Sequence, residues 1–291
     1  MNINIVAGID RGWDWSYSRM AIAIQQRLKY NIEISNCPLP SFFDIVHFIP
    51  GDQALISSLQ NLNSKKVAFL GNFYEWNNKL RGVLGNIDIG VFQQEQLRND
   101  VVKQGIDESM LRVIRPGIDL DKFKVIIKVG IVGHVRVAQN RNKGGVDLIQ
   151  LFMRAKWENF KFVFAGKDWD KEFGNAYRDS GVNVEFLGNV PYKDMPSFYN
   201  TIDYLLIASK IDSGPLVLAE ALACGKPVIS TKVGWAPEFD VTHYETIDGL
   251  ADILWDIEKD FLTRRAQVEN LTWDNWAEKH GEIYRGLCAN L

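Results

Sequence analysis

Short apolar runs alternate with longer amphipathic segments along most of the chain. The runs are rich in Val, Ile and Phe, and the longer segments repeat their apolar residues at helical spacing. This alternation is typical of βαβ units in an α/β fold with a mostly parallel sheet. In the first half it predicts strands at 3–9, 32–35, 45–49, 67–70, 87–92 and 113–114, and helices at 16–29, 54–62 and 95–104. The pattern then starts again, with strands at 128–132, 160–165, 184–187, 204–207 and 227–230, and helices at 145–156, 169–179, 192–199 and 215–223.

The two halves of this pattern are joined where Pro116 and Gly117 interrupt it. We therefore expect two domains, one at 1–122 and one at 123–273. The tail from Leu250 onward has helical periodicity, and its tryptophans indicate packing against other elements. We expect its last helix, at about 274–291, to pack back on the first domain. Two open α/β sheets in tandem are expected to face each other across a cleft at the carboxyl ends of their strands, where such sheets bind ligands.

Composition and charge narrow the possible functions. Of 291 residues, 46% are hydrophobic and 24% are charged, which is ordinary for a globular protein. The formal net charge of −3 does not attract a polyanion, so a nucleic-acid partner would need a local basic patch. Three widely spaced cysteines predict neither disulfides nor a zinc site. No apolar stretch is long enough to cross a membrane and the first residues lack signal-peptide features, so we expect a cytoplasmic protein.

The segment 208–229 has the clearest local pattern in the chain. An apolar strand ends at a small polar loop, Pro215 can occupy the first position of a helix, and Gly225 ends that helix. The amino end of such a helix carries unpaired N–H groups and attracts a phosphate or another anion. Asp212 lies in the loop before the helix and Glu220 lies on it. Taken alone, these two acids are more simply explained as a helix cap and a solvated side chain.

The order of residues in this segment resembles the donor site of retaining GT-B glycosyltransferases, particularly family four, also called group 1. In that family an acidic residue, seven intervening residues and a Glu precede a small-residue helix and Gly-x-Pro-Val, as in 212–228. The resemblance implies two Rossmann-like domains, with Glu220 on the ribose of a nucleotide and Asp212 facing the donor sugar. The family usually has Glu in place of Asp212 and Gly in place of Pro215. The resemblance also implies contacts to the sugar or diphosphate from Ser213, Gly214, Leu216 and Val217.

Three further stretches resemble the same family. Residues 113–123 are similar to its inter-domain segment, Pro-Asn-Gly-Val-Asp. Residues 130–147 are similar to the first strand and loop of its donor domain, where Lys143 is implied to contact the diphosphate. Residues 184–190 are similar to the strand and turn that read the base through the backbone, ending at Val190.

A diphosphate needs a compact cation and several backbone donors, which Lys143 supplies together with the two glycines that follow it. A surface lysine in a flexible loop is the alternative explanation. The family has an Arg directly after the glycine of the first donor-domain strand, but His134 follows Gly133 here. We therefore expect Arg136 to be the second phosphate cation. Near the nucleoside we expect Gly166 and Lys167.

No metal or other cofactor is expected beside the donor substrate. Asp168 and Asp170 have the D-x-D spacing of metal sites in the other large glycosyltransferase fold. They follow a stretch that matches the second donor-domain strand of family four, where the motif has no metal role. The four histidines share no ligand spacing. The chain also lacks a G-x-G-x-x-G after its first strand and a phosphate-binding P-loop, which disfavours a dehydrogenase or an NTPase.

Aromatic and polar residues follow two strands of the first half, where they would face the cleft. Rings bind sugar faces or stack on bases, and the polar groups between them bond hydroxyls. The alternative is that these rings pack the inter-domain hinge. Family members often carry a His after the fourth strand, whereas Gly71 and Asn72 stand here. The predicted acceptor residues are Gly12, Trp13, Trp15, Asn72, Tyr74 and Glu75.

These residues predict a retaining, metal-independent glycosyltransferase, either a hexosyl- or a pentosyltransferase. The expected donor is a nucleotide diphosphate sugar with UDP as the nucleotide, and the expected acceptor is a hydroxyl of a glycan, a protein or a modified nucleic-acid base. A basic patch from Lys65, Lys66, Lys79 and Arg81 would serve the last of these. The short first domain favours a large acceptor. Two alternatives stay open: a nucleotide-sugar epimerase of the same fold, and a sugar-nucleotide-binding protein without turnover.

Overall fold

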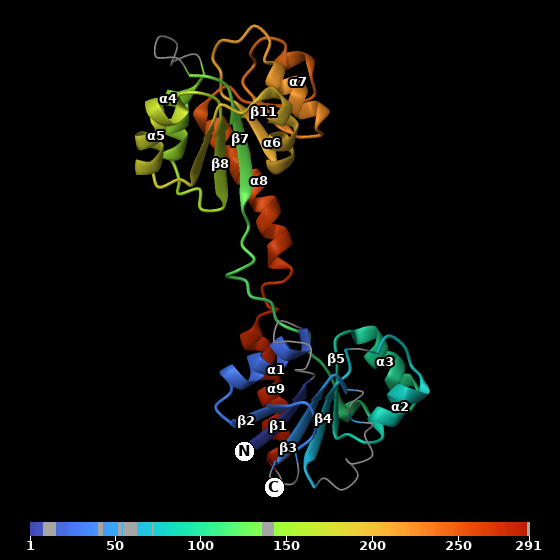
Figure 1. The fold of residues 1–291 in the computed structure, drawn as a ribbon. Helices are drawn as coiled ribbons and strands as arrows, with labels where there is room; N and C mark the ends of the chain where they lie inside the picture. The colour runs from blue at the N-terminus through green and yellow to red at the C-terminus, as the bar shows by residue number, and fades with distance from the viewer. Residues whose placement is uncertain are drawn as a thin grey trace. The chain divides into compact units, whose positions relative to one another are not determined.

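The computed structural model describes residues 1–7, 16–39, 43–51, 54, 63–71, 73–135 and 143–289. The chain divides into two compact units, each with one sheet and its own helices (Figure 1). Unit 1 comprises Met1–Phe123 and Val268–Leu291, and unit 2 comprises Lys124–Gln267. Each described sheet is six-stranded and wholly parallel, so the predicted α/β class with two Rossmann-like sheets is confirmed.

In unit 1 the strand order is β2-β1-β3-β4-β5-β6. Alternate residues of the central strands point to opposite faces, and both faces are covered, so the strands are apolar throughout. Helices α1 and α9 pack on one face and α2 and α3 on the other. The strands are β1 (Asn2–Ala7), β2 (Asn31–Ser35), β3 (Ile45–Ile49), β4 (Lys65–Phe69), β5 (Ile89–Phe92) and β6 (Leu111–Val113). The helices are α1 (Ser16–Arg27), α2 (Asn78–Leu84), α3 (Glu95–Lys103) and α9 (Trp273–Cys288), with a 3-10 turn at Glu108–Met110.

A buried polar cluster joins α9 to the sheet of unit 1. His47 Nδ1 on β3 lies 2.6 Å from the Tyr284 hydroxyl on α9, and the rings of His47 and His280 stack 5.1 Å apart. His280 Nδ1 lies 2.8 Å from the Trp276 carbonyl and donates to it, which leaves Nε2 of both histidines without a partner. Burial lowers the pKa of His47 well below its ordinary value and that of His280 to about 4. Both rings are therefore neutral near pH 7.

In unit 2 the strand order is β12-β11-β10-β7-β8-β9. Helices α4, α5 and α8 cover one face through an aromatic-rich core, and α6 and α7 cover the other (Figure 1). The strands are β7 (Ile127–Val132), β8 (Phe160–Ala165), β9 (Val184–Gly188), β10 (Tyr204–Ile207), β11 (Val228–Ser230) and β12 (Thr242–His243). The helices are α4 (Gly145–Phe152), α5 (Trp169–Asp179), α6 (Met195–Thr201), α7 (Leu216–Ala223) and α8 (Ile247–Ala266), with 3-10 turns at Tyr192–Asp194 and Ala236–Glu238.

Three local features differ from the predicted elements: helix α2, the start of α7, and the short strand β12, which was not predicted. Helix α2 was not predicted, and it begins where the Asn77 side chain accepts a hydrogen bond from the Leu80 N–H. Pro215 is the residue before α7 rather than its first helical residue. The predicted helix at 54–62 lies outside the described residues, apart from its first position. Within the described parts of the chain, no helix is both long and apolar enough to span a bilayer.

Candidate functional site

A pocket of about 240 Å³ opens in unit 2 at the carboxyl ends of β7 and β10. Its walls come from the last residues of these strands, the loop before α4 and the first turn of α7. The carboxyl ends of neighbouring parallel strands meet at one edge of the sheet, so the predicted residues that follow them converge. From the predicted set the pocket brings together Gly133, Lys143, Asp212, Gly214, Leu216 and Val217.

An ion pair connects the two sides of this pocket. Lys143 Nζ donates to Asp212 Oδ2 at 2.8 Å, and the Gly214 N–H donates to Asp212 Oδ1 at 3.2 Å. Burial by itself raises the pKa of the Asp212 carboxyl, but the hydrogen bonds from Lys143 and Gly214 and the Lys143 charge outweigh burial and lower the pKa. Asp212 is therefore ionised at neutral pH, and the pocket has no net charge from this pair.

Glycine at two positions allows the backbone segments around the pocket to approach closely. Gly144 caps α4 with φ +74°, and a Cβ there would collide with the Ala208 carbonyl at the end of β10. Gly166 follows β8 with φ +142°, and a Cβ there would collide with the Gly133 carbonyl. This close approach places Lys143, one residue before Gly144, beside the loop that carries Asp212.

The first turn of α7 presents main-chain donors to the same pocket. Pro215 precedes the helix and makes no side-chain cap, so no capping side chain occupies the first N–H groups of α7. Leu216 and Val217, whose N–H groups are the first two of the helix, both line the pocket. The positive end of the α7 dipole and Lys143 thus lie at one pocket, a combination that suits a phosphate.

Glu220 lies further along α7 and is held by a residue that was not predicted. The Tyr199 hydroxyl on α6 donates to Glu220 Oε2 at 2.7 Å. Tyr199 is 1% exposed, and burial together with the Glu220 hydrogen bond raises the pKa of its hydroxyl. The sequence did not predict this pair, because the two residues lie on different helices and Tyr199 has the pattern of an ordinary core aromatic residue.

Three other predicted donor residues meet beside β7 and β8. The exposed His134 accepts a hydrogen bond at Nδ1 from the Lys167 N–H at 2.8 Å, which leaves the proton of neutral His134 on Nε2. Gly166 precedes Lys167 and also lines a neighbouring hollow with Asp168 and Trp169. Val190 packs partly buried after β9, and Ser213 is exposed in the loop before α7. Arg136 lies outside the described residues.

On the acceptor side, Tyr74 and Glu75 follow β4 and are exposed. Tyr74 lines a pocket in unit 1 at the carboxyl ends of β4, β5 and β6. The other predicted acceptor residues, Gly12, Trp13, Trp15 and Asn72, lie outside the described residues.

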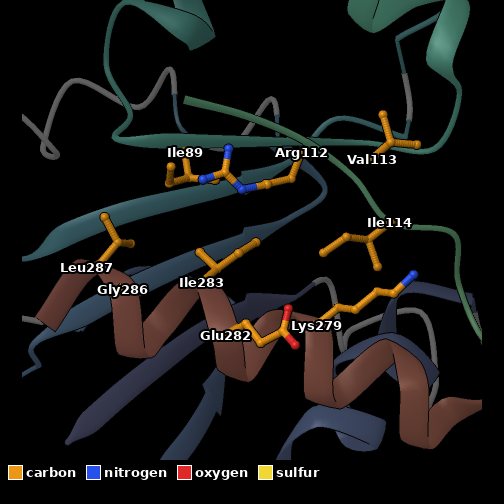
Figure 2. Close-up of a pocket in the computed structure, with 9 residues that line it drawn as sticks. All are labelled: Ile89, Arg112, Val113, Ile114, Lys279, Glu282, Ile283, Gly286 and Leu287. Carbon is orange, nitrogen blue, oxygen red and sulfur yellow. The ribbon is translucent and has the colours of Figure 1, made fainter. Parts of the chain in front are cut away.

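Two further features carry none of the predicted site residues. Figure 2 shows a groove in unit 1 between α9 and the β5–β6 edge, lined by the charged residues Arg112, Lys279 and Glu282 and by isoleucines from both sides. In the D-x-D motif of unit 2, Asp170 forms an ion pair with Arg178. Among the described residues, no group of three or more His, Cys, Asp or Glu side chains is arranged to hold a metal ion.

The second half of the chain matches a known family. Residues 124–250 match the family model described as glycosyl transferases group 1, which confirms the predicted resemblance at the level of the family. The gpi3 subunit of phosphatidylinositol N-acetylglucosaminyltransferase from Schizosaccharomyces pombe is 30% identical over 51% of this chain and 36% of its own length. The uncharacterized glycosyltransferase MJ1178 from Methanocaldococcus jannaschii is 29% identical over 34% of this chain and 28% of its own length.

Other similar proteins are a curated enzyme and a solved structure. D-inositol 3-phosphate glycosyltransferase from Corynebacterium jeikeium is 25% identical over 53% of this chain and 43% of its own length. The chain thus spans less than half the length of these three curated relatives. Anabaena HepE in complex with UDP and glucose aligns over 98% of this chain and 95% of its own, with 17% identity and a TM-score of 0.41.

Proposed function

We propose that this chain, whose residues 124–250 match the glycosyl transferases group 1 family, moves a sugar from a nucleotide diphosphate sugar to an acceptor hydroxyl. The observation that supports this most is the meeting of Lys143, Asp212 and the uncapped first turn of α7 in one pocket. These groups match the needs of a diphosphate joined to a sugar: a cation, main-chain donors and a carboxylate. We also propose UDP as the nucleotide, and the cytoplasm as the location.

In this proposal, binding of the donor exchanges partners within the pocket. The diphosphate takes Lys143 and the N–H groups of Leu216 and Val217, and the freed Asp212 carboxylate accepts a hydroxyl of the sugar. Glu220 accepts a ribose hydroxyl while Tyr199 holds its other oxygen. The Val190 backbone reads the base, with Gly166 and Lys167 near the nucleoside and His134 beside them.

Catalysis is then mainly electrostatic. The bond between the anomeric carbon and the diphosphate oxygen breaks, the bond to the acceptor oxygen forms, and the acceptor proton passes to the leaving diphosphate. Negative charge develops on that diphosphate, where Lys143, Arg136 and the α7 dipole stabilise it without a metal ion. Attack from the face that the diphosphate leaves gives retention, which we propose from the family resemblance.

The test is turnover of a panel of nucleotide diphosphate sugars by Lys143→Ala and Glu220→Gln variants. We expect the rate of donor hydrolysis or transfer to fall at least a hundredfold in Lys143→Ala, because the main cation of the leaving group is lost. Lys232→Ala is the matched control, since Lys232 is an exposed lysine of unit 2 that pairs with Glu245. Full activity in both site variants would contradict the proposal.

A sugar-nucleotide-binding protein without turnover is the second candidate. It is favoured by the Lys143–Asp212 pair, because each of these groups already satisfies the other before any donor arrives. Calorimetric binding of UDP, combined with no product from any acceptor, would support this candidate. A sugar product whose ring stereochemistry is inverted at one carbon, formed without an acceptor, would instead indicate an epimerase, whereas simple hydrolysis releases the sugar with its other carbons unchanged.

A further inference from the structure

A second pocket, of about 490 Å³, lies wholly within unit 1 at the carboxyl ends of β4, β5 and β6. This is the edge at which open α/β sheets bind ligands. Its apolar lining residues are Leu70, Phe73, Phe92, Leu97 and Leu271. Its polar side chains are Tyr74, Gln93, Gln94 and Arg115. A mainly apolar lining with a few polar groups is typical of a small-molecule site.

Arg115 gives this pocket a positive charge that the described lining does not balance. No Asp or Glu is among the described residues that line the pocket. The structure gives the Arg115 guanidinium no hydrogen bond or ion pair to any described residue, whereas Arg112, three residues earlier, donates to the carbonyls of Ser109 and Leu111. A guanidinium beside apolar walls and without a carboxylate favours a bound anion.

The position of Arg115 is not explained by the family resemblance. Where the inter-domain segment of the family reads Pro-Asn-Gly-Val-Asp, residues 115–119 read Arg-Pro-Gly-Ile-Asp. Arg115 therefore stands in place of a residue that carries no charge.

The remaining polar groups of the pocket suit hydroxyls. Gln94 is the residue before α3 and makes no capping hydrogen bond with its side chain, so its amide is free of that role. Gln93 Nε2 lies 3.5 Å from the Gly71 carbonyl, at the limit of a hydrogen bond. Tyr74 is 84% exposed and offers both a ring face and a hydroxyl. Two amides and an aromatic ring beside a cation suit a sugar that carries an acid group.

We infer that this pocket binds a sugar acceptor with a phosphate or carboxylate group, and that Arg115 pairs with that group. That the bound sugar is the acceptor of a transfer reaction rests on the proposed function. The binding of an anionic sugar at Arg115 does not depend on transfer. Glu75 and Glu95 are the nearest acids in the sequence to its polar residues, and neither lines the pocket.

Calorimetry on the whole protein with three probes tests this inference: glucose, glucose 6-phosphate and glucuronate. We expect at least one charged probe to bind at least tenfold more tightly than glucose. Arg115→Gln should remove that difference, and Arg115→Lys should keep part of it because the charge remains. Arg112→Gln is the matched control, since Arg112 is an exposed arginine of β6 that lines the groove in Figure 2. It should bind the charged probe as the unchanged protein does.

Equal or absent binding of all three probes, a preference that survives Arg115→Gln, or a preference lost equally in Arg112→Gln would each overturn the inference. UDP binding separates this outcome from failure of the proposed function. Arg115→Gln should bind UDP as the unchanged protein does, because the proposed nucleotide site lies in unit 2. If UDP does not bind at all, the donor assignment fails while the Arg115 result stands by itself.

Discussion

The two units share a parallel six-stranded architecture but distribute charge differently. In unit 2, Lys143 pairs with Asp212 inside the pocket, whereas in unit 1 the Arg115 guanidinium has no partner among the described residues. Unit 1 also buries the neutral imidazoles of His47 and His280, while the two histidines of unit 2 are more accessible. An anion that binds in unit 2 must replace Asp212 as the partner of Lys143, whereas an anion that binds in unit 1 supplies a partner that Arg115 lacks within the described part of the chain.

This difference affects what each pocket selects. Breaking the Lys143–Asp212 pair costs free energy unless the ligand satisfies both groups. A diphosphate without its sugar satisfies only the cation. The pocket of unit 2 is thus suited to a ligand that carries both groups, and that of unit 1 to any anion that fits.

The largest expected effect is that of acid, which should lower the stability of unit 1 through its buried histidines. The folded-state pKa of His280 is about 4, below the ordinary value of 6.5, so the unfolded chain binds more protons between these values. The contribution of His280 to the free energy of unfolding is therefore constant above about pH 6.5 and falls by about 3 kcal/mol as pH drops to about 4. Calorimetric unfolding at pH 7 and pH 4.5 measures the loss.

His280→Gln is the matched variant for the acid experiment, because glutamine does not titrate and offers an amide donor for the Trp276 carbonyl. Its unfolding free energy should change less between the two pH values than that of the unchanged protein. An unaltered acid response in this variant would show that His280 is not the responsible group.

Asp212→Asn should have the next largest effect, because it should raise the affinity for UDP and lower the rate of transfer. Without the carboxylate, Lys143 is free for a diphosphate, so we expect UDP to bind up to about tenfold more tightly. Transfer should fall about a hundredfold, or about 2.7 kcal/mol of transition-state stabilisation, because the sugar loses its acceptor group. Calorimetry and initial rates measure the two. Weaker UDP binding would instead mean that Asp212 only positions Lys143.

Tyr199→Phe should have the smallest effect of the three. The ring still fills the core, but the hydrogen bond to Glu220 is lost, which costs about 1 kcal/mol and about a fivefold rise in KM for the donor. Discrimination between UDP and 2′-deoxy-UDP should weaken with it, because Glu220 is then less well oriented toward the ribose. Unchanged discrimination with lowered stability would assign Tyr199 a purely structural role.

Local pattern was enough to predict every described strand except the two-residue β12, and also the turn that carries Asp212, because these signals lie within a few residues. The punctuation from Pro215 to Pro227 placed α7 to within one residue. Helix α2 was missed because the short stretch after Asn77 has little periodicity and begins at a side-chain cap. The pairing of Tyr199 with Glu220, and of Lys143 with Asp212, depends on how distant segments pack, and no spacing along the chain records that.

The discontinuity of unit 1 has a consequence for synthesis on the ribosome. Unit 2 is one uninterrupted stretch, Lys124–Gln267, inserted between β6 and α9 of unit 1. Every strand of the first sheet is made early, but the face that α9 covers waits for Trp276, Ile283 and Tyr284, which are translated after all of unit 2. Unit 1 is therefore begun before unit 2 and completed after it, and during that interval the face that α9 later covers leaves apolar surface open to chaperones.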